Sequence, residues 1–481
     1  MTKLIAVDLG TTLVKCTLFD ESGRTLASES LPCGLTYPAQ DRAEQDAELW
    51  YTGVCDAIAR LVRACGAEGI RGLSISSQSI SVVPVDARFR PLRTALSWLD
   101  VRADEECSLL AEALPVERWF RKTGKFLGPG YTLPKLLWLR RHEPELFSSA
   151  SKFLLPMDYV NARMTGHAVT DHTMAAGTMA YDVAMGGWDP ELLALVGLTP
   201  DHLAQVQPSG ALVGPIHEET ARMTGLPRET LVFNGGQDQK VAAFGAEIDA
   251  RRGSLSLGTA GALEIFVTDA ANQQLLPFFP YTVPGQTLVE GCVNTAGAAI
   301  QWLKDTICPD ISFDELNRLA AAAPVGSSGV RFYPHLSRPG TPHRGRSEYG
   351  SIRELSLGVT RGDLIRCLYE GLAYEFRLNL EYARQAGSEL EQLILFGGAS
   401  KSPVFCQIIA DVTGLKIEAA ENGEMGGIGA AKLSAQGLGL DSIGFARAAA
   451  GSTKQYLPNP DAVRLYDSLY QQYIETYRSE E

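Results

Sequence analysis

Asp8 and the short turn after it carry residue types that bind phosphate and metal. Residues 4–19 form an apolar run, a tight polar turn and a second apolar run, which predicts a β-hairpin with Asp8 at the end of its first strand. Gly10 allows the backbone to approach a bulky anion. The N–H groups and hydroxyls of Thr11 and Thr12 can donate to phosphate oxygens, and Asp8 can hold Mg²⁺ through water. An ordinary hairpin turn is the alternative.

A second turn of the same design lies about half a chain further on. Residues 253–267 again form an apolar run, a Leu257-Gly258-Thr259 turn and an apolar run. A Leu-Gly-Thr triad often recurs by chance. Its recurrence with flanking strands, at the matching place in each half of the chain, is much rarer by chance. The repeat therefore predicts a duplicated domain, with a nucleotide held between the two copies.

Alternating strand and helix signals surround both turns and must position them. Buried strands that end in polar or glycine turns are predicted at 70–77, 231–236 and 393–398, and further strands at 79–85 and 96–100. Helices are expected from about residue 102, from about residue 237, and at 296–307, 313–323, 361–386, 403–413 and 427–436. A hinge that starts at residue 245 divides the chain into domains 1–244 and 245–481.

The composition is that of an ordinary globular protein. The chain has 481 residues, of which 45 % are hydrophobic and 21 % charged, so it can build two sizeable domains. The net charge of −13 argues against nucleic acid or an anionic membrane as the main partner. It does not argue against a nucleotide, whose phosphates are held by local N–H groups. No apolar run reaches the roughly 18 residues of a spanning helix, and no leader pattern opens the chain, so we expect a cytoplasmic protein.

The cysteines and histidines show no metal-binding spacing. The nine cysteines are scattered and form no Cys-x-x-Cys pair, and the seven histidines form no zinc-type motif. His167 and His172 lie in a polar segment that reads as a loop. A structural zinc site is therefore not expected from the sequence.

Several segments together resemble the FGGY carbohydrate kinase family along nearly the whole chain. Residues 130–139 fit its first signature, residues 235–238 (Gly-Gly-Gln-Asp) fit its catalytic loop, and residues 396–403 fit its adenosine segment. The second signature, around 363–375, is imperfect because Cys367 stands where a small residue is usual. The resemblance implies an α/β fold of two ribonuclease-H-like domains, of the actin and hexokinase type, with the catalytic site in the cleft between them.

The resemblance also implies an ATP-dependent sugar kinase that uses Mg²⁺. It makes Asp238 the proton acceptor and, with Asp8, a metal ligand; the alternative for Asp238 is a helix N-cap. The residues expected at the phosphates are Thr11, Thr12, Lys15, Gly258 and Thr259. Those expected at the nucleoside are Gly397, Gly398, Ala399, Ser402 and Gln407. Lys15 as a solvated strand residue, and the glycine pair as a plain strand–helix turn, are the alternatives.

Sugar recognition is expected from polar turns of the first domain. Gln78 and the turn with Asp100 and Arg102 match sugar-binding positions of the family, with a structural Asp–Arg pair as the alternative. Residues 79–81, Ser-Ile-Ser, replace the Met-His-Gly usual in xylulokinases and the Arg-Glu of glycerol kinases. This uncharged, hydroxyl-rich turn favours a neutral five-carbon 2-ketose such as xylulose, phosphorylated on its terminal primary hydroxyl.

Other functions stay open at this point. Within the family, a deoxyketohexose, another polyol, glycerol or gluconate is an alternative substrate. Outside it, the alternative is an actin- or chaperone-like ATPase, against which the Gly-Gly-Gln-Asp loop argues. A sugar and ATP are the expected partners, and a homodimer is left open.

Overall fold

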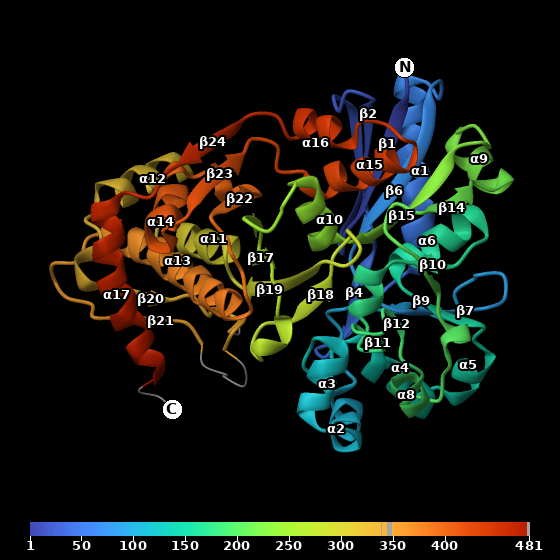
Figure 1. Ribbon diagram of the computed structural model, residues 1–481, viewed down its shortest axis with the longest axis horizontal. Coiled ribbons are helices and arrows are strands. Elements are labelled where there is room, and N and C mark those ends of the chain that lie inside the picture. Colours follow the sequence, from blue (N-terminus) through green and yellow to red (C-terminus); the bar gives the residue numbers. More distant parts are fainter. Residues whose placement is uncertain (338, 344–348, 479–481) are drawn as a thin grey trace. The chain divides into compact units, whose positions relative to one another are not determined.

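The computed structural model describes residues 1–337, 339–343 and 349–478. Its contacts divide the chain into two compact units (Figure 1). Unit 1 comprises Met1–Glu247, Phe279–Gln286 and Met425–Ala450, and unit 2 comprises Ile248–Phe278, Thr287–Glu424 and Gly451–Glu481. The boundary expected at residue 245 lies close to the first passage from unit 1 to unit 2. The two later segments that belong to unit 1 were not foreseen.

Unit 1 is built on a six-stranded sheet in the order β14-β15-β6-β1-β2-β3. Its strands are β1 (Lys3–Leu9), β2 (Leu13–Asp20), β3 (Thr25–Pro32), β6 (Ile70–Ser77), β14 (Leu212–Pro215) and β15 (Leu231–Gln237). The predicted hairpin is present, since β1 and β2 pair antiparallel. Strands β1 and β15 both run parallel to β6. The carboxyl ends of these three strands therefore meet at one edge of the sheet.

Helices from both ends of the chain cover this sheet. The main helices of unit 1 are α1 (Ala47–Cys65), α4 (Thr132–His142), α6 (Pro156–Thr165), α10 (Asp238–Gly245), α15 (Met425–Gly437) and α16 (Ser442–Ala450). Figure 1 shows α15 and α16, coloured in red tones, beside the blue strands β1 and β2. Helix α1 begins at Asp46, whose carboxylate accepts the N–H of Glu48, and buries Trp50 and Val54 in the core of the sheet.

Shorter elements complete unit 1. They are β4 (Leu35–Ala39), β5 (Arg42–Gln45), β7 (Val83–Val85), β8 (Ala95–Leu96), α2 (Asp104–Ala113), α3 (Val116–Thr123), α5 (Pro144–Ser149), β9 (Lys152–Leu154), β10 (Val169–Thr170), α7 (His172–Ala176), β11 (Tyr181–Asp182), β12 (Gly187–Trp188), α8 (Pro190–Leu195), β13 (Gln205–Val206) and α9 (Glu218–Thr224). Residues 79–82, expected in a strand, form an irregular loop. Ile80 there has φ 73°, a left-handed conformation that a β-branched residue does not adopt within a strand.

Unit 2 repeats the plan of unit 1 with a seven-stranded sheet in the order β18-β19-β17-β16-β22-β23-β24. Its strands are β16 (Arg252–Leu257), β17 (Gly261–Phe266), β18 (Phe278–Pro280), β19 (Thr287–Val293), β22 (Gln392–Phe396), β23 (Lys416–Ala420) and β24 (Thr453–Tyr456). The second predicted hairpin is present, since β16 and β17 pair antiparallel. Strands β16, β22 and β23 are parallel, so their carboxyl ends also share one edge.

Four helices of unit 2 lie close to their predicted ranges, and the last one, α17, was not predicted. They are α11 (Gly297–Thr306), α12 (Phe313–Ala322), α13 (Arg361–Gln385), α14 (Pro403–Thr413) and α17 (Pro460–Arg478), with a small sheet of β20 (Arg331–Tyr333) and β21 (Ser351–Arg353). Helix α13 begins with a capping box, in which Thr360 and Asp363 satisfy each other's backbone N–H groups. In the described part of the chain, none of the helices has the length and apolar character that crossing a membrane requires.

Candidate active site

Two carboxylates lie at the carboxyl edge of the unit 1 sheet. Asp8 of β1 and Gly236 of β15 are each in register with Ser76 of β6, so the three residues are level across neighbouring strands. The hydroxyl of Ser76 donates to Asp8 Oδ1 at 3.1 Å. Asp238 follows Gly236 by two residues and opens α10. The parallel topology therefore brings both predicted acidic residues to one edge.

Asp238 is the first residue of α10, and the N-cap position belongs to Gln237. One oxygen of the Asp238 carboxylate accepts the N–H of Gln239 at 2.8 Å. The N-cap alternative therefore does not describe Asp238. Its position in the first turn favours the ionised carboxylate, because the helix N-terminus carries partial positive charge.

A buried polar cluster fixes the loop before Asp238. The N–H of Gln237 donates to Thr173 Oγ1 at 2.8 Å, and that hydroxyl donates to Asp171 at 2.8 Å. The hydroxyl of Ser209 also donates to Asp171, at 2.7 Å. Burial raises the pKa of Asp171, although these hydrogen bonds oppose the shift. The sequence analysis did not select Thr173 or Asp171, because the contact spans two sequence-distant segments.

Helix α15 approaches the same edge of the sheet, and this close approach accounts for the glycines near its start. A Cβ on Gly426 would lie 3.2 Å from Ser76 Oγ and 3.6 Å from Asp8 Oδ1, so a larger residue would crowd the carboxylate. A Cβ on Gly429 would lie 1.9 Å from the carbonyl oxygen of Val241 in α10, which is closer than any real contact. These glycines let α15 pack tightly against α10 and against the edge that holds Asp8.

The loop after β6 is held firmly in place. The N–H of Gln78 donates to the carbonyl of Leu9 at 2.8 Å, and its side-chain amide donates to the carbonyl of Gly10 at 3.2 Å. Ser81 N–H donates to the carbonyl of Ser79 at 2.8 Å, which closes a tight turn around Ile80. Strained backbone of this kind is often found at binding sites. Gln78 thus lies directly beside the β1–β2 hairpin, and its proposed contact with the sugar stays a prediction.

Asp100 and Arg102 form a closed ionic network. Asp100 is fully buried, and its carboxylate accepts from the N–H of Ala43 at 2.8 Å and from the guanidinium of Arg102 at 2.7 Å. The same guanidinium donates to Glu44 at 2.6 Å and lies 4.9 Å from the ring of Trp138. Contacts with Asp100 and Glu44 raise the pKa of Arg102, although burial opposes them. This geometry favours the structural Asp–Arg pair that the sequence left as the alternative.

The Lys135 side chain also has a structural position. It is fully buried, and its ammonium donates to the carbonyl of Ser97 at 2.6 Å. Burial lowers the pKa of Lys135 to about 7. Lys135 therefore fixes the turn that precedes Trp98, whose indole N–H donates to the hydroxyl of Thr11 at 2.8 Å. Through these two hydrogen bonds, Lys135 of the first signature indirectly supports the turn between β1 and β2.

The other predicted phosphate residues of unit 1 occupy the hairpin as expected. Thr11 and Thr12 lie in the turn, which the N–H of Gly10 closes by donating to the carbonyl of Leu13 at 3.0 Å. Lys15 is half-buried on β2, directly opposite Asp8 in the register. Its proposed contact with phosphate stays a prediction.

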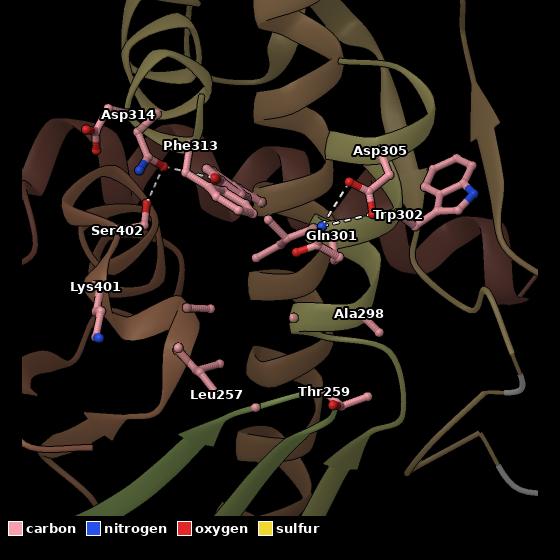
Figure 2. Close-up of a pocket in the computed structure, with 17 residues that line it drawn as sticks. Leu257, Thr259, Ala298, Gln301, Trp302, Asp305, Phe313, Asp314, Lys401 and Ser402 are labelled. Atoms are coloured by element: carbon pink, nitrogen blue, oxygen red, sulfur yellow. Dashed lines mark hydrogen bonds between the residues drawn. The ribbon is translucent and has the colours of Figure 1, made fainter. Parts of the chain in front are cut away.

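Unit 2 contains a cavity of about 870 Å³ at the carboxyl ends of its parallel strands. Figure 2 shows Leu257 and Thr259 at the strand ends, with Gln301 and Phe313 on the surrounding helices and Ser402 just before α14. The residues that line it are Leu257, Gly258, Thr259, Gly297, Ala298, Ile300, Gln301, Trp302, Asp305, Phe313, Asp314, Asn317, Tyr369, Gly398, Ala399, Lys401 and Ser402. Five predicted nucleotide residues are thus brought together: Gly258, Thr259, Gly398, Ala399 and Ser402.

Close backbone approaches shape the floor of this cavity. Gly397 has φ 98°, and a Cβ there would lie 2.7 Å from the carbonyl oxygen of Leu257, so only glycine lets β22 end against β16. The N–H groups of Ala296 and Ala298 donate to the carbonyl of Thr259 at 3.0 and 3.1 Å. These bonds fix the start of α11 against the 257–259 turn.

A polar group on the cavity wall was missed by the sequence analysis. Asn317 Oδ1 accepts from the hydroxyl of Ser402 at 2.7 Å and from that of Tyr369 at 2.9 Å. Ser402 is also the N-cap of α14, since its oxygen accepts the N–H of Phe405. Gln407 does not line the cavity: its amide donates to Asp411 and to the carbonyl of Leu457. No local motif marked Asn317, because its partners Tyr369 and Ser402 lie far from it in the sequence and meet it only in the folded unit.

Comparison with known proteins covers the whole chain. Residues 3–245 match the N-terminal domain of the FGGY family of carbohydrate kinases, and residues 253–438 match its C-terminal domain. The chain is 30 % identical to the xylulose kinase of Bacillus subtilis (strain 168) over 488 residues, which cover 99 % of this chain and 97 % of that one.

Solved structures agree with this similarity. The crystal structure of xylulose kinase from Rhodospirillum rubrum matches with a TM-score of 0.92 and 27 % identity, over 99 % of this chain and 98 % of that one. The gluconate kinase from Lactobacillus acidophilus matches with a TM-score of 0.91 and 26 % identity, over the same shares of the two chains.

Proposed function

Because the chain belongs to the FGGY family of carbohydrate kinases, we propose that it transfers the γ-phosphate of ATP to the terminal primary hydroxyl of a neutral ketopentose, with xylulose as the first candidate. The kinase activity follows from the family. The observation that supports a catalytic edge in unit 1 is the convergence of Asp8 and Asp238 on the carboxyl ends of β1, β6 and β15.

Asp238 is the proposed proton acceptor. A general base must reach the proton that it removes, and a carboxylate at the tip of a strand–helix turn can do so. The hydrogen bond from the N–H of Gln239 orients one oxygen of Asp238. Asp238 would take the proton of the sugar hydroxyl as the oxygen of that hydroxyl attacks the γ-phosphate in line.

The donor set at this edge fits Mg²⁺. The hydroxyl of Ser76 donates to one oxygen of the Asp8 carboxylate, and carboxylate oxygens suit a hard divalent cation. When bound by Asp8 and Asp238, Mg²⁺ would neutralise charge on the phosphates.

The cavity of unit 2 is the proposed nucleotide pocket. Its volume suits a ligand of nucleotide size, and apolar walls with a few polar groups suit a purine. Thr259 at the strand end is placed to donate to phosphate, while Asn317 and Ser402 lie on the wall at the start of α14. Thr11 and Thr12 supply corresponding donors in unit 1. Gln407 is left out of this proposal, because its amide is bonded elsewhere.

The neutral ketose is supported by two observations. The relatives that match over the full chain at about 30 % identity include the xylulose kinase of Bacillus subtilis. In addition, the polar side chains of the 78–81 loop are an amide and hydroxyls, from Gln78, Ser79 and Ser81, and the loop carries no charged side chain. Such groups pair with sugar hydroxyls, and the loop offers no cation to a carboxylate.

A gluconate-like acid is the second candidate, and a specific observation favours it. Lys125 and Lys240 are fully buried in unit 1, with their ammonium groups 3.5 and 3.9 Å from the ring centroid of Phe279. Lys240 lies on α10, two residues after Asp238. An acidic sugar would gain from cations near the acceptor carboxylate. The match to gluconate kinase from Lactobacillus acidophilus agrees with this alternative.

A screen of ADP release tests the proposal. Purified protein with ATP and Mg²⁺ would be assayed against ketopentoses, deoxyketohexoses, polyols, glycerol and gluconate. The proposal expects the highest kcat/KM with a ketopentose. Highest kcat/KM with gluconate would select the second candidate, and ATP hydrolysis that no sugar stimulates would overturn the sugar kinase itself.

A further inference from the structure

Two histidines and a glutamate form a compact buried cluster in unit 2. His335, His343 and Glu375 are 5 %, 8 % and 1 % exposed. One nitrogen from each histidine and one carboxylate oxygen all lie within 4.8 Å of one another. None of the three lines the cavity assigned to the nucleotide.

The carboxylate of Glu375 lies between the two imidazoles. Its Oε2 is 2.6 Å from His343 Nε2, and its Oε1 is 3.8 Å from His335 Nε2. The two imidazole rings meet edge to face at 70°, with their centroids 4.9 Å apart. A nitrogen of each ring therefore lies near the carboxylate. The hydroxyl of Tyr473 donates to Glu375 Oε1 at 2.7 Å.

The backbone around the cluster is well anchored. Glu375 lies within the long helix α13. One turn later, the amide of Asn379 donates to the carbonyl of Thr341 at 2.9 Å, and its oxygen accepts the hydroxyl of Thr341 at 2.7 Å. The N–H of Gly350 donates to the carbonyl of His335 at 2.8 Å. The ligand atoms are therefore presented by a rigid helix and by a segment tied to it.

We propose that His335, His343 and Glu375 bind one divalent transition-metal ion of the Zn²⁺ class. Two imidazole nitrogens and one carboxylate oxygen are a donor set that suits zinc and its neighbours rather than Mg²⁺ or Ca²⁺. Zinc bonds of about 2.0–2.2 Å place tetrahedral ligand atoms roughly 3.4 Å apart. The three ligand atoms lie within 4.8 Å of one another, so side-chain rotations would bring them to that spacing around one ion.

The ion would replace the hydrogen bond between His343 and Glu375 and would clamp His335 and His343 to α13. Tyr473 would act as an outer-shell donor that orients the carboxylate, which is a usual feature of metal sites. Solvent would complete the coordination. The site is structural and independent of the kinase reaction, so its failure would leave the proposed function untouched.

Co²⁺ and Zn²⁺ binding tests this site on the untagged full chain. After dialysis against a chelator, and without ATP or Mg²⁺, Co²⁺ would be titrated while visible absorption is recorded. We expect one Co²⁺ per chain, the intense bands of a tetrahedral ion, and their loss when Zn²⁺ is added. The melting temperature of the wild type should also rise with Zn²⁺.

Three variants locate the site. His335→Asn keeps the hydrogen bond of His343 to Glu375, and Glu375→Gln keeps the size of the side chain; each should weaken Co²⁺ binding at least tenfold. His217→Asn, at an exposed histidine of unit 1, is the control and should bind as the wild type does. Circular dichroism checks that each variant folds. Absence of stoichiometric binding in the wild type, or equal weakening in His335→Asn and His217→Asn, would overturn the proposal in favour of a metal-free His–Glu–His hydrogen-bond cluster.

Discussion

The hydroxyl of Thr173 accepts the backbone N–H of Gln237 at 2.8 Å, one residue before the proposed proton acceptor Asp238. Thr173 comes from α7 and Gln237 ends β15, so this bond joins two segments of unit 1 that are far apart in the sequence. A Cβ on Gly236 would lie 3.0 Å from the same hydroxyl, which shows how closely the loop fits against Thr173.

We expect Thr173→Val to lower kcat about tenfold to a hundredfold with little change in the KM for ATP. The substitution leaves the Gln237 N–H unsatisfied, and a small displacement of Asp238 then misplaces the proton acceptor. Thr173→Ser should restore most of the turnover. Thr178→Val removes another buried hydroxyl that bonds to backbone, and serves as the control. Equal kcat losses in the Thr173 and Thr178 valine variants would mean a general packing effect.

Replacing Asp238 by Asn should lower kcat by about 10²- to 10⁴-fold, because the amide cannot accept the sugar proton. The melting temperature should change little, since Asp238 is half-buried and asparagine has the same size and can still accept the N–H of Gln239. Asp249→Asn changes an exposed aspartate with a similar backbone contact and is the control. Steady-state ADP release measures both. A variant that keeps a tenth of wild-type turnover would contradict the role of Asp238.

Removal of the Thr259 hydroxyl should mainly weaken ATP binding. Thr259→Val deletes one proposed donor to a charged phosphate, which is worth roughly 1.5–3 kcal/mol and so a KM for ATP raised about tenfold or more. The KM for the sugar should stay near its wild-type value. Thr268→Val, at an exposed threonine after β17, provides the comparison. An unchanged KM for ATP would leave Thr259 with a turn-forming role only.

Truncation of Asp100 should act first on stability. Asp100→Ala leaves the guanidinium of Arg102 with Glu44 alone in a buried site, and breaking such a pair typically costs about 3–5 kcal/mol. Urea unfolding of the wild type, Asp100→Ala and the double variant Asp100→Ala/Arg102→Leu would measure this. Direct sugar binding by Asp100 predicts instead a sharply raised sugar KM with the stability preserved.

Asp158 should make stability depend on pH. Burial raises its pKa from 3.8 to about 8, so between these values the folded chain holds a proton that the unfolded chain has lost. The contribution of Asp158 to stability is therefore complete below pH 3.8 and is lost as the pH rises toward 8. Asp158→Asn removes this dependence. The stability of the wild type relative to the variant should fall by about 4 kcal/mol from pH 5 to pH 8, and parallel curves would refute the assignment.

The local patterns in the sequence determined the elements that carry the chemistry. The two hairpins, the strand that ends at Gly236 and the helices α13 and α14 were predicted because each follows from the period of its own apolar residues and from its own turn residues. The Gly-Gly-Gln-Asp loop was identified instead by its resemblance to the family's catalytic loop. Family membership was recognisable because these motifs recur in order along the whole chain.

Tertiary structure alone decided which residues lie close together. The assignment of α15 to unit 1, the bond between Thr173 and Gln237, and the position of Asn317 in the cavity each join segments far apart in the chain. No local period encodes such contacts. Asp100 shows the same limit of sequence analysis. Its turn was recognisable in the sequence, but its complete burial against Arg102 depends on how β5, β8 and α4 pack around it.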